Sequence, residues 1–141
     1  MNWADLIDFS EKIKNDPKAS EAEKRAAISR AYYACHHLAK AALKAKGIDC
    51  IHGDAPHATH AAVVKELTRL DVKLGIRLDQ CRSDREWADY TSGSLSQIDI
   101  DARMADSLEL AKDIRAWAER VIASVPPVGQ RRKVVTAPNK D

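Results

Sequence analysis

The sequence lacks a long hydrophobic run, and this absence limits the class of protein. None of its apolar stretches approaches the roughly 20 residues that a helix needs to span a membrane. Its first residues, MNWADLIDFSEK, have neither the basic start nor the apolar centre of a signal peptide. We therefore expect a cytoplasmic protein that does not insert into a membrane.

Cysteine, glycine and proline are also scarce. The three cysteines, Cys35, Cys50 and Cys81, have no CxxC spacing, so we expect reduced thiols in a core and no disulfide scaffold. Five glycines and five prolines in 141 residues are too few for a repetitive, collagen-like or disordered chain. With 45% hydrophobic and 31% charged residues, the sequence predicts one globular domain.

A large excess of one charge is missing as well. The formal net charge is +2, and the segment 126–141 carries four basic residues and one acid, so the rest of the chain is close to neutral. This balance gives little support for nonspecific binding of nucleic acid. We assign residues 1–125 to one domain and 126–141 to a flexible polar and basic tail. Its basic run, Arg131, Arg132 and Lys133, is of the kind that is more often solvated than bound to phosphate.

Helical periodicity runs through the domain, whereas no stretch alternates as a β-strand does. The pattern predicts an all-α bundle of four to five helices over 2–15, 21–47, 57–70, 71–90 and 99–124. A capping box, SEAE at Ser20–Glu23, begins the second helix, and Gly47 ends it. Because this helix is rich in alanine, we expect it at the centre of the bundle.

The periodicity also predicts which faces are buried. We expect the third helix to turn Ala61, Val64 and Leu67 inward, with Leu70 at its end, and Asp99 to cap the last helix. The inward face of the second helix is the longest of those in the first half of the chain. It consists of Ile28, Tyr32, Cys35, Ala39, Ala42 and Leu43.

Histidines in and after the loop between the second and third helices invite a metal interpretation. His52, His57 and His60, with Cys50 and Asp54, are residue types that bind zinc. Their spacing fits no finger or catalytic pattern, and a third ligand would have to come from the loop. The sequence therefore favours a polar loop, and we expect neither a metal nor a cofactor.

His36 is the histidine best placed for a site between two helices. It lies four residues after Tyr32 and shares its face of the second helix. The neighbouring Cys35 points about 100 degrees away and lies on the apolar stripe, so it is a core thiol and not a nucleophile.

Arg85 occupies a position at which the periodicity requires an apolar residue. The fourth helix has Leu74, Leu78, Cys81, Arg85 and Ala88 on one face. Burying an unpaired guanidinium costs several kcal/mol, so such an arginine must be paired, lie at an interface or serve a function.

Two interpretations of Arg85 stay open at this point. In the structural one it pairs with Asp89, four residues further along the helix. In the functional one, Arg85, Asp89 and Tyr90 line a polar groove, and Arg82 extends the basic line by one turn. Tyr90 does not share the face of Arg85 in an unbroken helix. It can turn back where TSGS ends the helix, or come from a second copy of the chain.

The segments SRAYYACHHLAKAALKAKG and REWADY, with a histidine near a helix start between them, resemble the HEPN superfamily (higher eukaryotes and prokaryotes nucleotide-binding). The resemblance covers roughly residues 3–125 and agrees in the order of helices. It implies a bundle that commonly forms a homodimer, with the arginine motif near the subunit interface. Many members are metal-independent RNases of toxin, phage-defence and RNA-processing systems, and some pair with a small nucleotidyltransferase.

The sequence departs from the catalytic pattern of those RNases. Their arginine is followed after four to six residues by a histidine, whereas Tyr90 stands five residues after Arg85 and no histidine follows. A tyrosine, with a pKa of about 10, is a poor base in RNA cleavage. The resemblance implies Arg85 and Tyr90 as the catalytic pair if the chain is active. Arg82, Asp89, Tyr32 and His36 are then the binding residues.

The leading interpretation is a noncatalytic or weakly active HEPN module of a prokaryotic defence or toxin–antitoxin system. It holds a nucleotide, RNA or a partner such as a nucleotidyltransferase or antitoxin-like protein. One alternative is a metal-independent RNase that uses Arg85 with Tyr90 and His36. The other is a purely structural dimer in which Arg85 and Asp89 form a buried ion pair.

Overall fold

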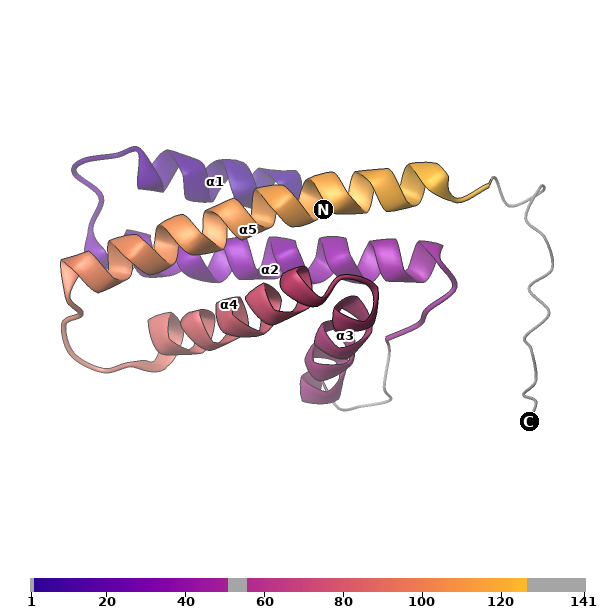
Figure 1. Cartoon of the computed structure of the whole chain (residues 1–141). Helices are drawn as coiled ribbons and strands as arrows, with labels where there is room; N and C mark the ends of the chain where they lie inside the picture. The colour runs from indigo at the N-terminus through magenta and orange to yellow at the C-terminus, as the bar shows by residue number, and fades with distance from the viewer. Residues whose placement is uncertain (1, 51–55, 127–141) are drawn as a thin grey trace.

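The computed structural model describes residues 2–50 and 56–126, which form five α-helices and no strand. In chain order these are α1 (Ala4–Lys14), α2 (Glu21–Ala45), α3 (Pro56–Leu70), α4 (Val72–Tyr90) and α5 (Gln97–Ser124). Four of them run roughly along one another, and α3 crosses them steeply (Figure 1). The all-α bundle is therefore confirmed. The predicted tail, apart from Pro126, lies outside the described residues.

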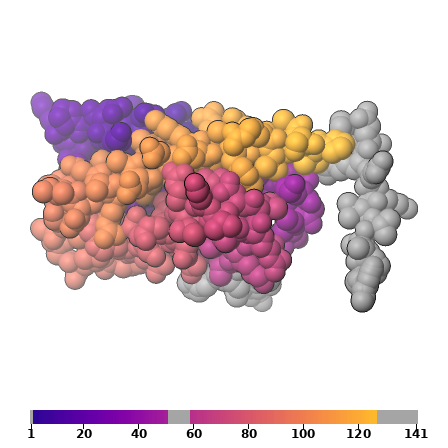
Figure 2. Space-filling model, in the orientation of Figure 1, coloured from indigo at the N-terminus to yellow at the C-terminus, as the bar shows by residue number. Residues whose placement is uncertain are grey.

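Helix α2 lies at the centre of the bundle, as its alanine content predicts. It contacts each of the other four helices, most extensively α5, and Figure 2 shows it largely covered on one face. The capping box is present, because the Ser20 hydroxyl accepts from the Glu23 N–H at 3.1 Å and the Glu23 carboxylate accepts from the Ser20 N–H at 2.9 Å. Gly47, at φ +86°, ends the helix in the left-handed conformation that favours glycine. All six residues of the predicted inward face are buried.

The corner between α3 and α4 depends on a glycine. Asp71 caps α4 by accepting from the Leu74 N–H at 3.0 Å. One turn later, a Cβ added to Gly75 would lie 2.0 Å from Thr68 Oγ1 and 2.5 Å from Thr68 Cα. The close approach of the two helices at this point therefore requires glycine.

The inward face of α3 differs from the prediction by about one residue. Val63 and Leu67 are buried and Val64 is half-buried, whereas Ala61 and Leu70 are exposed. Helix α3 packs against both α2 and α4. Its buried side is set by this crossing, which the apolar spacing within one short helix does not define.

The start of α5 also corrects the sequence interpretation. Ser96 is the N-cap and accepts from the Asp99 N–H at 3.5 Å, so Asp99 lies in the first turn and does not cap the helix. Its negative charge there still favours the positive end of the helix dipole. The apolar residues of α5 that are buried in the bundle are Ile100, Met104, Leu108, Leu110, Ala111, Ile114, Trp117 and Ala118.

The cysteines serve the packing of the bundle. Cys35, Cys50 and Cys81 are all buried and carry free thiols, as predicted. Burial raises the pKa of the Cys35 thiol well above its usual value, so the group stays protonated and inert. Over the described part of the chain, no helix has the length and apolar character needed to cross a bilayer.

Candidate functional site

Arg85 lies on the buried face of α4, where aromatic rings surround it. Its side chain is 13% exposed, and its guanidinium carbon lies 5.5 Å from the ring centroid of Tyr32. The same carbon lies 5.6 Å from the centroid of Tyr33 and 5.9 Å from that of Tyr90. These distances allow cation–π attraction to three rings. The apolar residues predicted to share this face of the helix, Leu74, Leu78, Cys81 and Ala88, are all buried.

The polar contacts of Arg85 leave part of its hydrogen-bonding capacity unused. One terminal nitrogen lies 3.6 Å from an Asp89 oxygen that also accepts from the Ser29 hydroxyl at 3.2 Å. Burial acts to lower the pKa of Arg85, because it disfavours the charged form. Tyr33, Asp89 and Tyr90 favour the charged form and outweigh the burial, so the pKa is raised and the group stays cationic. Its Nε atom is buried and has no hydrogen-bond partner among the described residues. The predicted intrahelical pair is therefore present, together with an unused donor.

The carboxylates near Arg85 are paired with cations. Asp84 accepts from Arg103 at 2.6 Å, and Glu86 lies 3.8 Å from Arg82 at the partly exposed edge of the helix. With Asp89 also paired, each acid around the arginine has a positive neighbour. This arrangement reduces the repulsion that these acids would exert on a phosphate.

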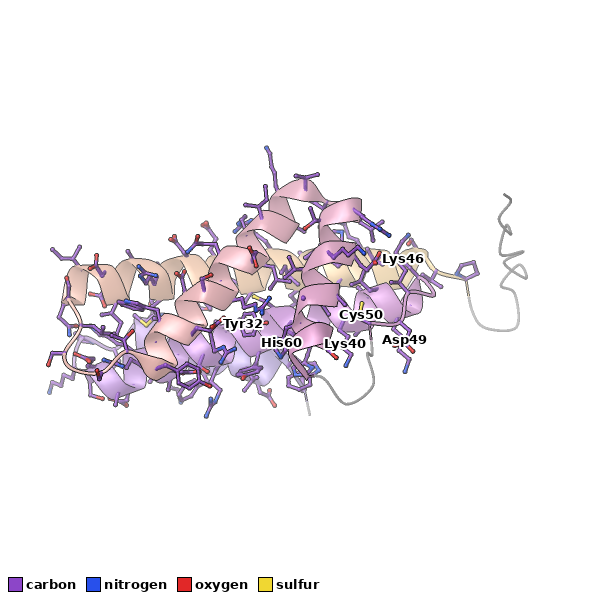
Figure 3. The ribbon with its side chains drawn as sticks, turned by 90° about the horizontal axis from the view of Figure 1, so that it is seen from below. Tyr32, Lys40, Lys46, Asp49, Cys50 and His60 are labelled. Atoms are coloured by element: carbon purple, nitrogen blue, oxygen red, sulfur yellow. The ribbon has the colours of Figure 1, made fainter. Side chains whose placement is uncertain are left out.

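A group of stacked rings extends from Arg85 across α2, and we call it the aromatic–histidine cluster. Its members are Trp3, Tyr32, Tyr33, His36, His37 and His60. The His36 ring stacks on that of His60 with centroids 4.0 Å apart, and Trp3 stacks on His37 at 3.8 Å. The Tyr32 hydroxyl and His60 Nδ1 form a hydrogen bond of 2.5 Å where α3 meets α2 (Figure 3).

Burial keeps two members of the aromatic–histidine cluster uncharged. It raises the pKa of Tyr32 above its usual value, so the hydroxyl keeps its proton. Burial, with smaller contributions from His60 and His37, lowers the pKa of His36 to about 3. His36 Nδ1 is buried without a hydrogen-bond partner in the described part of the chain. The site thus sets the fixed charge of Arg85 beside a neutral imidazole and a neutral phenol.

The structure brings together most of the residues singled out in the sequence. Arg85, Asp89 and Tyr32 lie in direct contact or close to it, and His36 joins them through the ring stack. Tyr90 is the last residue of α4 and is 75% exposed, yet its ring reaches Arg85 within the same chain. Arg82 lies at the edge of the site.

Sequence reasoning missed Tyr33, Trp3 and the ring contacts of His60. Tyr33 follows Tyr32, which lies on the predicted inward face of the second helix, and the periodicity gave no reason to place the Tyr33 ring at Arg85 as well. His60 was weighed as a metal ligand, although its position near the start of a helix is part of the HEPN-like pattern. Within the described residues, no group of three metal-ligating side chains converges. The loop residues His52 and Asp54 and the side chain of His57 lie outside them.

A further arginine fixes the segment that follows Tyr90. Arg25, on α2, donates to the carbonyl oxygens of Thr91 and Gly93, each at 2.6 Å. Its neighbour Glu21 accepts from Arg25 Nε and from the Leu95 N–H, both at 3.1 Å. We call this set of bonds the Arg25 clamp. Arg25 also donates to the Ala88 carbonyl oxygen at 3.1 Å, so the clamp satisfies one carbonyl in the last turn of α4 and two in the segment that follows the helix.

Fold and site together define an all-α bundle in which a charged, largely buried arginine lies among tyrosine rings beside a neutral histidine. Comparisons with protein-family models, with curated proteins and with solved structures each found no match to this chain. The family interpretation therefore rests on the motifs and their spacing alone.

Proposed function

We propose that the chain is a HEPN-type module of a prokaryotic defence or toxin–antitoxin system that binds RNA or a nucleotide with little or no cleavage. The supporting observation is Arg85, which is cationic, surrounded by three tyrosine rings, and carries a buried Nε without a described partner. Phosphate oxygens are the acceptors that a guanidinium binds best. The exposed ring of Tyr90 offers a surface on which a base can stack.

The electrostatics of the site favour binding over catalysis. Metal-independent cleavage needs one group that accepts a proton and one that donates a proton near neutral pH. With a pKa of about 3, His36 is a neutral imidazole at that pH, and the imidazolium form that acts as a general acid is not populated. Tyr32, whose pKa is raised, does not ionise to act as a base. Both shifts support a noncatalytic or weakly active site.

The RNase alternative has one observation in its favour. His60 stacks on His36 and bonds to Tyr32, so a second imidazole lies close to the tyrosines that surround Arg85. In this alternative, Arg85 stabilises the phosphate and Tyr90, with a histidine, moves the protons. The structural alternative draws its support from the Arg85–Asp89 pair. The resemblance adds two expectations to the proposal. The chain forms a homodimer, and it pairs with a nucleotidyltransferase or an antitoxin-like protein.

Fluorescence anisotropy measures the binding of a short labelled single-stranded RNA in EDTA and tests the proposal. Arg85→Ala is expected to weaken binding by roughly 10- to 100-fold, which corresponds to one or two hydrogen bonds to a charged phosphate. The matched control is Arg115→Ala on α5, which removes an arginine paired only with Glu119 among the described residues. The control is expected to bind as the unchanged protein does.

The same samples separate the alternatives. Cleavage of the RNA that disappears in Arg85→Ala would support the RNase. A folded Arg85→Ala protein that binds as tightly as the unchanged protein would contradict the binding proposal. A variant that loses its folded state or its oligomeric state, measured by circular dichroism and sedimentation, would favour the structural alternative.

A further inference from the structure

One side of α2 is left partly open by the other helices. Arg30 and Lys44 are exposed on that side, and Tyr33, His37 and Lys40 between them are half-buried. These five residues follow one another at steps of three or four, so their side chains form one stripe along the helix. We call it the α2 stripe. At 1.5 Å per residue, it is about 21 Å long.

A line of aromatic rings joins Arg85 to the α2 stripe. The guanidinium carbon of Arg85 lies 5.9 Å from the ring centroid of Tyr90 and 5.6 Å from that of Tyr33. From Tyr33 the line continues to His37, whose ring centroid is 6.4 Å away at an interplanar angle of 24°. It ends at Trp3, which stacks on His37 at 3.8 Å and 7°. We call these four rings the aromatic track.

Solvent reaches each residue of the aromatic track. Tyr90 is 75% exposed, and the other three residues are half-buried. Tyr32 and His36, by contrast, are buried, so they belong to the core of the site and not to its surface. A ligand can therefore contact the track without any change in the packing of the bundle.

The charge along this part of α2 suits a polyanion. No aspartate or glutamate occurs between Lys24 and Lys46. The cations of the α2 stripe, Arg30, Lys40 and Lys44, form no ion pair within the part of the chain that the structure describes. No carboxylate of this stretch would therefore repel the phosphates of a strand that lies along it.

Accessible rings beside cations are the arrangement by which proteins bind single strands of nucleic acid, because every base has a π face. His37 contributes a neutral ring, since burial and the nearby Lys40 lower its pKa. We propose that the aromatic track binds three or more consecutive unpaired nucleotides, with one base on Tyr90, one on Tyr33 and one on the stacked pair beyond it. This inference rests on the RNA-binding proposal. It gives that proposal a substrate class, single-stranded oligonucleotides, in place of mononucleotides and duplexes.

Competition of AMP and of oligoadenylates of increasing length against the labelled RNA tests the track. The affinity is expected to rise at least about tenfold from AMP to the trinucleotide, because each stacked base adds to the binding. It is expected to change little beyond the hexanucleotide, because the track is then filled. A mixed-sequence strand annealed to its complement is expected to bind more weakly than the strand alone, since paired bases cannot reach the rings. Equal affinity for strand and duplex would overturn the inference.

His37→Leu locates the binding on the track. Leucine keeps an apolar side chain and removes the π face, so the hexanucleotide is expected to bind about tenfold more weakly, the effect of one stacked base. AMP is expected to bind as tightly as before, because a single nucleotide is held at Arg85 and Tyr90. The control is Trp87→Leu, which removes a ring that contacts Arg103 outside the track and is expected to leave both affinities unchanged. Circular dichroism checks that each variant is folded, and the length series decides the question if His37→Leu is not.

The outcomes separate this inference from the proposal on which it rests. Binding that is lost in Arg85→Ala, but is equal for AMP and the hexanucleotide, would overturn the aromatic track and leave the RNA-binding proposal standing. Hexanucleotide binding that is unchanged in a folded His37→Leu protein would also overturn the track. Absence of binding by all of these ligands would overturn both.

Discussion

At the scale of single residues, His36 couples the stability of the site to pH. The residue is 3% exposed, and burial lowers its pKa to about 3. In the unfolded chain a histidine titrates at about 6.5. Between these values the unfolded chain binds one more proton than the folded chain. The contribution of the neutral His36 to the free energy of unfolding is therefore fully present above about pH 6.5, and it is lost progressively as the pH falls below that value.

We expect His36 to lower the free energy of unfolding by up to about 1.4 kcal/mol per pH unit as the pH falls from about 6.5. Urea unfolding between about pH 5 and 7.5 measures this slope while most carboxylates remain ionised. His36→Phe keeps a ring but cannot titrate, so it is expected to reduce the slope. Because the pKa of His37 is also lowered, part of the slope is expected to persist. A slope identical to that of the unchanged protein would assign the proton uptake to other groups.

The residues of the site were predictable to the extent that one helix defines them. Arg85 and Asp89 follow from the phase of α4, because residues within two turns decide which side is buried. Two of the three rings that contact the guanidinium, Tyr32 and Tyr33, come from α2, and their contact with Arg85 depends on how the two helices cross. Tyr33 was missed for this reason, and His60 because only the fold places it against Tyr32.

At the scale of helices, the corner between α3 and α4 is sensitive to one methyl group. Gly75 packs so closely on Thr68 that an added Cβ would lie 2.5 Å from the Thr68 backbone. A backbone atom cannot rotate away, so the two helices would have to separate. The same corner sets how α3, which carries His60, lies against α4, which carries Arg85.

Gly75→Ala is therefore expected to destabilise the fold by about 1–3 kcal/mol, the usual cost of overpacking, although alanine is the better helix former. Ser83→Ala, at an exposed position on the same helix, is the control and is expected to change stability by less than about 0.5 kcal/mol. Chemical denaturation measures both. A Gly75→Ala protein as stable as the control would show that the corner can relax at little cost.

Helix ends and faces were predictable where local chemistry decides them. The capping box at Ser20 and the glycine at position 47 act within one turn, so the sequence alone defines them. The start of α5 was misplaced because two polar residues, Ser96 and Asp99, are both suitable caps. Only the path of the preceding loop distinguishes them.

At the scale of the whole molecule, charge predicts how RNA binding should respond to salt. The net charge of +2 includes a segment, 126–141, with four basic residues and one acid, which leaves residues 1–125 with a net charge of −1. If Arg85 provides the main phosphate contact, few counterions are released on binding. We therefore expect the affinity for RNA to fall by less than about tenfold between about 50 and about 200 mM salt.

Anisotropy titrations over this salt range measure the effect. The control is the protein in which Arg131, Arg132 and Lys133 are changed to alanine. The slope of RNA affinity against salt concentration is expected to be equal in the two proteins. A steep slope that becomes shallow in the control would show that the basic run, and not Arg85, contributes most of the phosphate contacts.

The Arg25 clamp has a consequence for how a ligand would bind. Apart from the Glu21 carboxylate, the acceptors of Arg25 are backbone carbonyls more than 60 residues away in the chain, so no side-chain pattern in the sequence indicates the clamp. By fixing the segment after Tyr90, it places that ring before any ligand arrives. Association then requires little ordering of the protein and a small loss of conformational entropy. Under the RNA-binding proposal, the ligand would therefore meet a preorganised surface rather than one that forms around it.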